Sequence, residues 1–127
     1  MALVDLARDL IADALLGGSS YTKFNSANAH LGVGDSSAAF ASSQTDLQAA
    51  TNKTRKSMDA TYPSRSANVL TFRATFGTGD ANYAWNERGI VNASSSGQML
   101  SRKVISLGTK TSSASWQLTC TDTVVLV

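Results

Sequence analysis

The stretch that most constrains the fold is residues 69–76, where apolar and polar side chains alternate. The two faces of this stretch are Leu70, Phe72, Ala74 and Phe76 on one side and Thr71, Arg73 and Thr75 on the other. Alternation with a period of two is typical of a β-strand that has one face in a core and one face toward solvent. We therefore expect truncation of Phe72 to destabilise the fold far more than truncation of Thr71.

Further segments of the same kind recur along the chain, separated by polar turns every eight to fifteen residues. They cover residues 29–33, 53–60, 99–107 and 115–127. Serine and threonine make up roughly a quarter of the residues, a content that favours strands and polar turns over helices. This pattern predicts a mainly β fold: an antiparallel β-sandwich or open barrel. At 127 residues we expect a single domain, 1–127, with its β-rich body at 29–127.

The N-terminal segment has the periodicity of a helix instead. Its apolar positions are Leu3, Leu6, Ala7, Leu10, Ile11 and Ala14, with charged residues between them. We predict an amphipathic helix over 3–16, ended by Gly17-Gly18. The charges within this segment argue against a signal peptide or a membrane span, so we expect synthesis in the cytoplasm and no membrane partner.

Two glycine-containing stretches are less generic than the rest. In residues 32–35, Gly32 and Gly34 predict a tight turn, with Asp35 accepting from turn amides. In residues 84–91, we predict a locked corner: Trp85 supplies its body, Glu87 caps amides or pairs with a base, and Gly89 takes positive φ. Gly89→Val should then damage folding more than Glu87→Gln. Between them, residues 45–48 have the spacing of a capping box and predict a helical turn over 45–50.

The sequence offers little for catalysis, metal binding or nucleic-acid binding. His30 is the only histidine and Cys120 the only cysteine, so neither has a partner of its own kind. Carboxylates do not fall at the spacing of a calcium loop. A net charge of +2 is too small to indicate a phosphate-binding surface. We expect no catalytic residue, cofactor, metal, nucleic acid or small-molecule substrate. One alternative of a different class is a carbohydrate-binding module that stacks a sugar on Tyr83, Trp85 and Trp116.

The order of short motifs along the chain carries a family resemblance. It runs from the N-terminal helix through Leu-Gly-Val-Gly-Asp (31–35), Gln-Thr-Asp-Leu (44–47), Leu-Thr-Phe-Arg (70–73), Trp-Asn-Glu-Arg-Gly-Ile (85–90) and Gly-Gln-Met-Leu-Ser-Arg (97–102) to Lys110. This order resembles small virion proteins of tailed bacteriophages and is similar to the N-terminal collar-type domain of phage tail fibres. Each motif is short, but together they span nearly the whole chain.

The resemblance implies a non-enzymatic structural role in the virion, with copies of itself and other tail or capsid proteins as partners. A tail fibre continues into a shaft and a tip, whereas this sequence ends at Val127. The expected roles are therefore a tail or fibre-attachment adaptor or, alternatively, a capsid decoration protein. We expect assembly contacts at both ends of the chain: Leu3, Leu6 and Leu10 on the helix, and Val124, Val125, Leu126 and Val127 on a terminal strand whose edge can pair with a neighbour. Deleting residues 122–127 should then abolish incorporation into particles, whereas deleting 92–96 should not.

Overall fold

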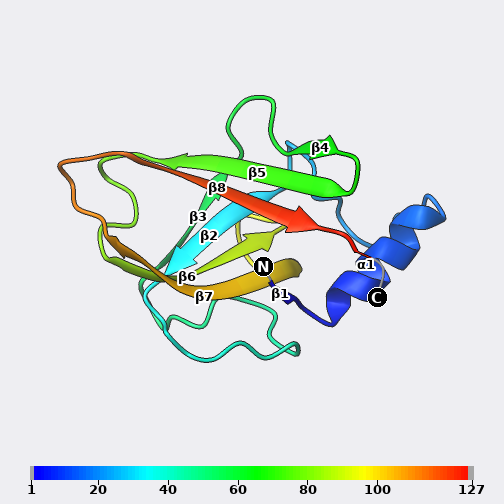
Figure 1. The fold of residues 1–127 in the computed structure, drawn as a ribbon, viewed down its shortest axis with the longest axis horizontal. Coiled ribbons are helices and arrows are strands. Elements are labelled where there is room, and N and C mark those ends of the chain that lie inside the picture. The colour runs from blue at the N-terminus through cyan, green and yellow to red at the C-terminus, as the bar shows by residue number, and fades with distance from the viewer. Residues whose placement is uncertain (1, 126–127) are drawn as a thin grey trace.

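In the computed structural model, which describes residues 2–125, two antiparallel sheets pack face to face and one helix projects at an end (Figure 1). The larger sheet has the strand order β1-β7-β6-β2-β3, and the smaller has the order β4-β5-β8. Neither sheet closes on itself, and their face-to-face packing is consistent with the sandwich. The mainly β fold class predicted from the sequence is confirmed.

The elements follow one another in the order of their labels. Their bounds are β1 (Ala2–Leu3), α1 (Leu6–Leu15), β2 (His30–Gly34), β3 (Lys53–Ser57), β4 (Ser64–Ser66), β5 (Val69–Phe76), β6 (Ala84–Val91), β7 (Met99–Thr109) and β8 (Trp116–Thr123).

Strand β5 begins and ends where the alternating pattern placed it. Phe72, Ala74 and Phe76 are buried, while Thr75 on the other face is exposed. The buried face packs with apolar residues of β2 and β8 in one core, which contains Leu31, Val33, Leu118 and Cys120. Trp85 joins this core edge-on, with its ring centroid 4.8 Å from Phe76 and 5.0 Å from Trp116.

The helix is shorter than the predicted range of 3–16. Leu3 lies not on α1 but on β1, where it pairs with Ser101 of β7. The predicted glycine stop is confirmed, because Gly17 takes a positive φ of 66° and Gly18 N–H donates to the carbonyl of Asp13. The helical spacing of apolar residues therefore extends to Leu3, but in the structure Leu3 pairs with the edge of the larger sheet and α1 begins at Leu6.

The predicted turn at Gly32 and Gly34 is wrong, since both glycines lie inside strand β2. Their role is close packing rather than chain reversal. A Cβ on Gly32 would lie 2.8 Å from Leu47 Cδ1, and Gly34 would meet the carboxylate of Glu87. Asp35 follows the strand and accepts from the Asn52 side chain at 2.8 Å instead of from turn amides.

The predicted corner at residues 84–91 is also wrong. The segment is the continuous strand β6, and Gly89 is not among the glycines of positive φ. Gly89 pairs with Gly32 across the strands, and a Cβ there would lie 3.0 Å from Met99 Cε and 3.2 Å from Leu47 Cδ2. The two glycines therefore form a shallow depression on the outer face of the sheet, which the Leu47 side chain fills.

Leu47 belongs to an irregular loop, 35–52, that runs over this outer face. The helical turn predicted for 45–50 is absent from this loop. The Gln48 side chain donates to the backbone oxygen of Asp46, and the amides of Gln48 and Ala49 bond to Glu87 rather than to a helical cap. A tertiary acceptor thus overrides the local capping pattern.

The C-terminal strand β8 ends at Thr123, and Val124 is anchored by bonds in both directions with Asn68. Leu126 and Val127, proposed above as contacts, lie outside the described residues. None of the described helices is long and apolar enough to cross a membrane.

Candidate functional site: a buried clamp and an apolar end

The residues with catalytic chemistry do not come together. His30 is half-buried, and its Nδ1 lies 2.8 Å from the carbonyl oxygen of Asn28. Cys120 is buried in the core, where burial raises the pKa of its thiol. Within residues 2–125, no group of three or more His, Cys, Asp or Glu side chains is placed to hold a metal ion.

The three aromatic residues considered for sugar stacking, Tyr83, Trp85 and Trp116, lie in the core or pack against it. Trp85 is 2% exposed and its indole N–H donates to the Ala81 carbonyl. The Tyr83 hydroxyl bonds to Val33 and Thr54, and burial raises its pKa. Trp116 is half-buried beside Trp85 and keeps one accessible side, at a shallow pocket. Tyr83 and Trp116 are half-buried against the core and Trp85 is buried, so the three rings do not form the exposed stacking platform that the alternative required.

The chain's best-defined polar site is an ion pair between Glu87 of β6 and Arg102 of β7. Both side chains are 0% exposed, and Arg102 Nε lies 2.7 Å from Glu87 Oε2. Glu87 also accepts the backbone amides of Gln48 and Ala49 at 2.9 and 2.8 Å. The two roles expected of Glu87, amide cap and partner of a base, are present together.

Arg102 completes this arrangement with its remaining nitrogens. Nη1 donates to Gln44 Oε1 and Nη2 to the carbonyl of Ala38, both at 3.0 Å. The loop 35–52 is thus held at Ala38, Gln44, Gln48 and Ala49 by two side chains that rise from the sheet beneath it. We call Glu87, Arg102 and these four loop positions the buried clamp. Because the pair is desolvated and each nitrogen of the Arg102 guanidinium has a partner, we expect its main effect to be to fix one conformation of the loop.

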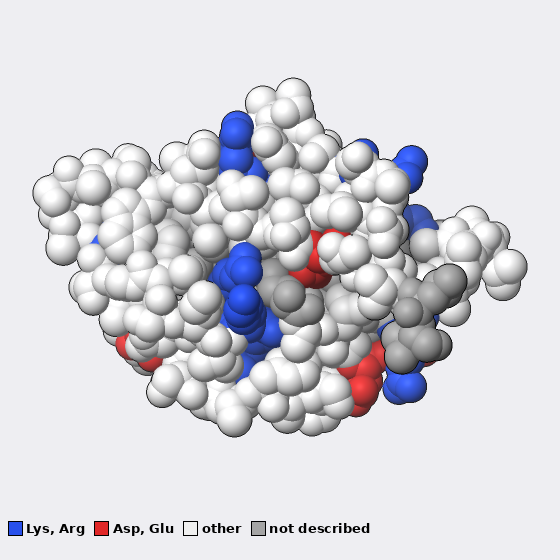
Figure 2. Space-filling model, in the orientation of Figure 1, with Lys and Arg blue, Asp and Glu red and all other residues white. Residues whose placement is uncertain are grey.

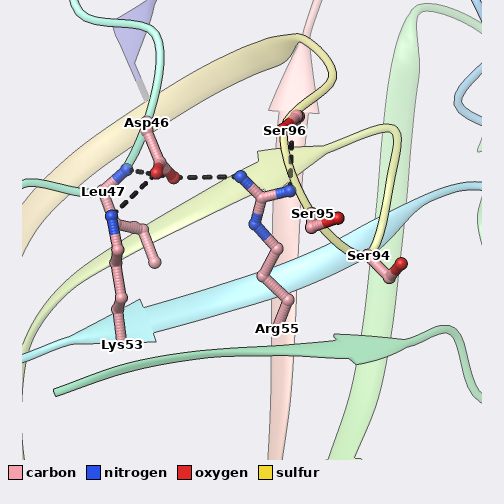
Figure 3. A pocket seen from close by; sticks show the side chains of 7 residues that line it. All are labelled: Asp46, Leu47, Lys53, Arg55, Ser94, Ser95 and Ser96. Carbon is pink, nitrogen blue, oxygen red and sulfur yellow. Dashed lines mark hydrogen bonds and ion pairs between the residues drawn. The ribbon is translucent and has the colours of Figure 1, made fainter. Parts of the chain in front are cut away.

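A second, exposed arrangement ties the same loop to strand β3 (Figure 3). Asp46 accepts from Lys53 Nζ at 2.8 Å and from Arg55 Nη2 at 3.0 Å. Partial burial opposes ionisation of Asp46, but these bonds and the Leu47 amide outweigh it and hold the pKa of Asp46 below its ordinary value. Arg55 Nη1 also donates to the carbonyl oxygens of Ala93 and Ser96.

Around Asp46 and Arg55 lies a polar pocket of about 240 Å³, to which the serines of the loop at 94–96 contribute. In Figure 3, Arg55 extends between Asp46 and Ser96, joining the two loops across the pocket. The cations here are already engaged by Asp46 and by carbonyl oxygens, so the pocket is the junction of two loops rather than a preformed anion site. The third basic residue of β3, Lys56, takes no part in this pocket and pairs with Asp80 at 3.0 Å instead.

Large exposed apolar side chains gather at one end of the molecule. Among the described residues they are Ile11, Leu15, Leu16, Val124 and Val125, with Leu3 further back on β1. Leu15 and Leu16 are 81% and 91% exposed, at the end of the helix that projects from the sandwich (Figure 1). Exposed leucines in adjacent positions leave apolar area in water that the chain's own core does not cover.

Beside these side chains lies an apolar pocket of about 160 Å³ between α1 and the sandwich. It is lined mainly by Leu10, Ile11, Phe24, Leu70 and Leu100. Asn68, two residues before Leu70, bonds to Val124, so the C-terminal segment runs close to the same end. We call the set Ile11, Leu15, Leu16, Val124 and Val125 the apolar end.

The expected contact residues coincide with the apolar end only in part. Val124 and Val125 are exposed as expected, while Leu10 is buried and Leu6 half-buried within the chain's own packing. Leu15 and Leu16 were not expected. Their signal was the leucine pair directly before the glycine stop: two adjacent helical positions point about 100° apart, so one narrow core-facing stripe cannot cover both.

Comparison with protein families, with characterised proteins and with solved structures gives no match to this chain.

Proposed function

We propose that this chain is a non-enzymatic structural protein of a bacteriophage virion, present in several copies. In this proposal it docks on the particle as a tail or fibre-attachment adaptor, with capsid decoration as the alternative placement. The proposal rests on the order of motifs that resembles phage virion proteins and on the apolar end. The apolar end is the observation that carries it, because it is a surface suited to a protein partner.

The physical case for a protein partner begins with the cost of exposed apolar area. Burying a leucine side chain gains about 1.5–3 kcal/mol, so Leu15 and Leu16 together offer several kcal/mol to a partner that covers them. In a particle, many copies of a modest contact act together and produce stable attachment.

The test replaces the two exposed leucines with serine, which removes their apolar area from the surface. In the phage that encodes the chain, Leu15→Ser/Leu16→Ser should lower the amount of the protein in purified particles at least tenfold. The matched control, Ser94→Ala/Ser95→Ala, changes two exposed residues of the loop before β7 and should incorporate normally. Quantitative mass spectrometry against the major capsid protein supplies the measurement, after thermal unfolding shows that both variants are folded.

Normal incorporation of the folded leucine variant would overturn the assignment of the apolar end. These substitutions are also cleaner than the deletions expected from the sequence. Removing 122–127 takes away the buried Asp122, which accepts from Ser101 at 2.7 Å, and removing 92–96 breaks the bonds from Arg55 to Ala93 and Ser96. Either deletion could therefore lower incorporation by destabilising the fold rather than by removing a docking contact.

A further inference from the structure

The sandwich has strand edges of unequal character. The sheet orders leave β1 and β3 at the edges of the larger sheet and β4 and β8 at the edges of the smaller one. An edge strand presents unpaired N–H and C=O groups, which bind other strands unless charge, shortness or irregularity prevents it. The four edges can therefore be compared by the protection that each one carries.

Three of these edges are protected. Strand β3 carries Lys53, Arg55 and Lys56 within five residues, and β4 is only three residues long. Strand β1 is two residues long, so most of β7 lies beyond it. That part of β7 is irregular. Glu87 pairs with Val104 and Trp85 pairs with Gly108, so two residues of β6 span the same length as four residues of β7. A bulge of this kind twists an edge away from regular pairing.

Strand β8 has none of these protections. It is eight residues long and pairs with β5 without a register shift from Val69↔Thr123 to Phe76↔Trp116. Its one charged residue, Asp122, is buried under the sheet. In residues 2–125, the backbone groups of β8 bond only to β5, so every second residue directs its N–H and C=O to an open side.

We propose that the open edge of β8 pairs with β8 of a second copy, antiparallel and about a two-fold axis, to join two three-stranded sheets into one sheet of six strands. This inference rests on the proposed function, since it names one contact between copies of the subunit. A second copy fits because an isologous contact needs a self-complementary surface. The exposed side chains of β8 are Gln117, Thr119, Thr121 and Thr123. Antiparallel self-pairing aligns them only with one another, and Thr–Thr pairs are favourable.

The charged groups near β8 give the dimer a definite salt dependence. Arg88 of β6 acts electrostatically on both Cys120 and Asp122, so it faces β8 from the other sheet, and Lys103 is its cross-strand neighbour on β7. In Figure 2, Lys and Arg side chains cross the face of the molecule beside β8. Asp122 of β8 offsets one of these two positive charges, which leaves one in excess in each copy, and a two-fold axis at β8 brings the excess charges of both copies toward each other. Screening by salt should therefore strengthen the dimer.

The experiment measures the mass of the purified protein by light scattering after size exclusion, over a concentration series up to about 1 mM. The parent should shift from monomer to dimer with rising concentration, and the shift should come at lower concentration in about 0.5 M than in about 0.05 M salt. Thr119→Lys/Thr121→Lys places lysines of the two copies opposite each other and should raise the dimer dissociation constant at least tenfold. The matched control, Ser64→Lys/Ser66→Lys, adds the same charge to edge strand β4 and should leave dimerisation unchanged.

A parent that stays monomeric throughout the series overturns the inference, as does a dimer that the lysines of β8 leave intact. The concentration series uses only the parent protein, so it tests the inference even if the lysine variant fails to fold. The outcome is separable from the proposed function. A monomer whose incorporation still depends on Leu15 and Leu16 retains the virion role and loses only the β8 contact.

Discussion

The buried clamp makes a strong prediction about Glu87→Gln. Three donors converge on the two oxygens of Glu87: Arg102 Nε and the Gln48 amide at Oε2, and the Ala49 amide at Oε1. A glutamine keeps one oxygen, so at least one buried donor meets an NH₂ group, at a cost of about 1–3 kcal/mol. Arg102, at 0% exposure, also loses its counter-charge. We expect a total loss of about 3–5 kcal/mol, the range for a broken buried pair.

The assay is urea unfolding followed by tryptophan fluorescence, since Trp85 lies in the core and reports its opening. Asp46→Asn is the control, because the Asp46 pairs are partly exposed and should contribute no more than about 1 kcal/mol. In a double-mutant cycle with Arg102→Met, the two losses should fall short of additivity by at least about 0.5 kcal/mol. A Glu87→Gln loss below about 1 kcal/mol would refute the view that Arg102 is desolvated and depends on Glu87 for its counter-charge.

Three further predictions concern the packing and titration of the sandwich. Gly89→Val should destabilise by about 1–3 kcal/mol through overpacking, less than Glu87→Gln and so the reverse of the ranking expected from the sequence. Adding Leu47→Ala to the Gly89→Val variant should relieve part of that cost, because Leu47 is one of the side chains that the valine would meet. Backbone strain at a positive φ would not be relieved in this way. The denaturant midpoints of the single and double variants distinguish the two causes. Phe72→Ala should cost about 3–5 kcal/mol and Thr71→Ala under about 1, and equal losses in urea unfolding would contradict the observed facing of β5. Burial raises the pKa of Asp122 above its usual 3.8, so its contribution to stability is complete below pH 3.8 and falls as pH rises through the folded pKa. Asp122→Asn should therefore gain stability relative to the parent between about pH 3 and pH 7, and a difference independent of pH would contradict this.

Local pattern was sufficient where the burial of a strand follows from its own residues. The bounds of β5 and the buried face of β8 with Leu118 and Cys120 were predictable in this way. The glycine stop after α1 was predictable because it depends only on residues adjacent in sequence. In each case, the controlling interaction is local or repeats with a simple period.

The errors arose where a distant residue decides the conformation. Gly32 and Gly89 were interpreted as turn formers because the sequence does not show that Leu47 packs across both. The capping pattern at 45–48 failed because Glu87, thirty-nine residues from Gln48, takes the amide that the pattern assigned to a helix. For Glu87 the sequence indicated only that a basic residue could pair with it. The identity of that residue, Arg102, depends on the register between β6 and β7, which the sequence does not show.

The central claim is that the chain is a multi-copy component of a virion. The most direct test of this proposal is quantitative mass spectrometry of gradient-purified particles from a phage whose genome carries this sequence, with the major capsid protein as the internal standard. The account predicts a fixed number of copies per particle, the same in independent preparations and retained after a high-salt wash, because apolar contacts are not weakened by salt. Particles that are complete and infectious but lack the chain, or that lose it in proportion to the washing, would contradict the claim.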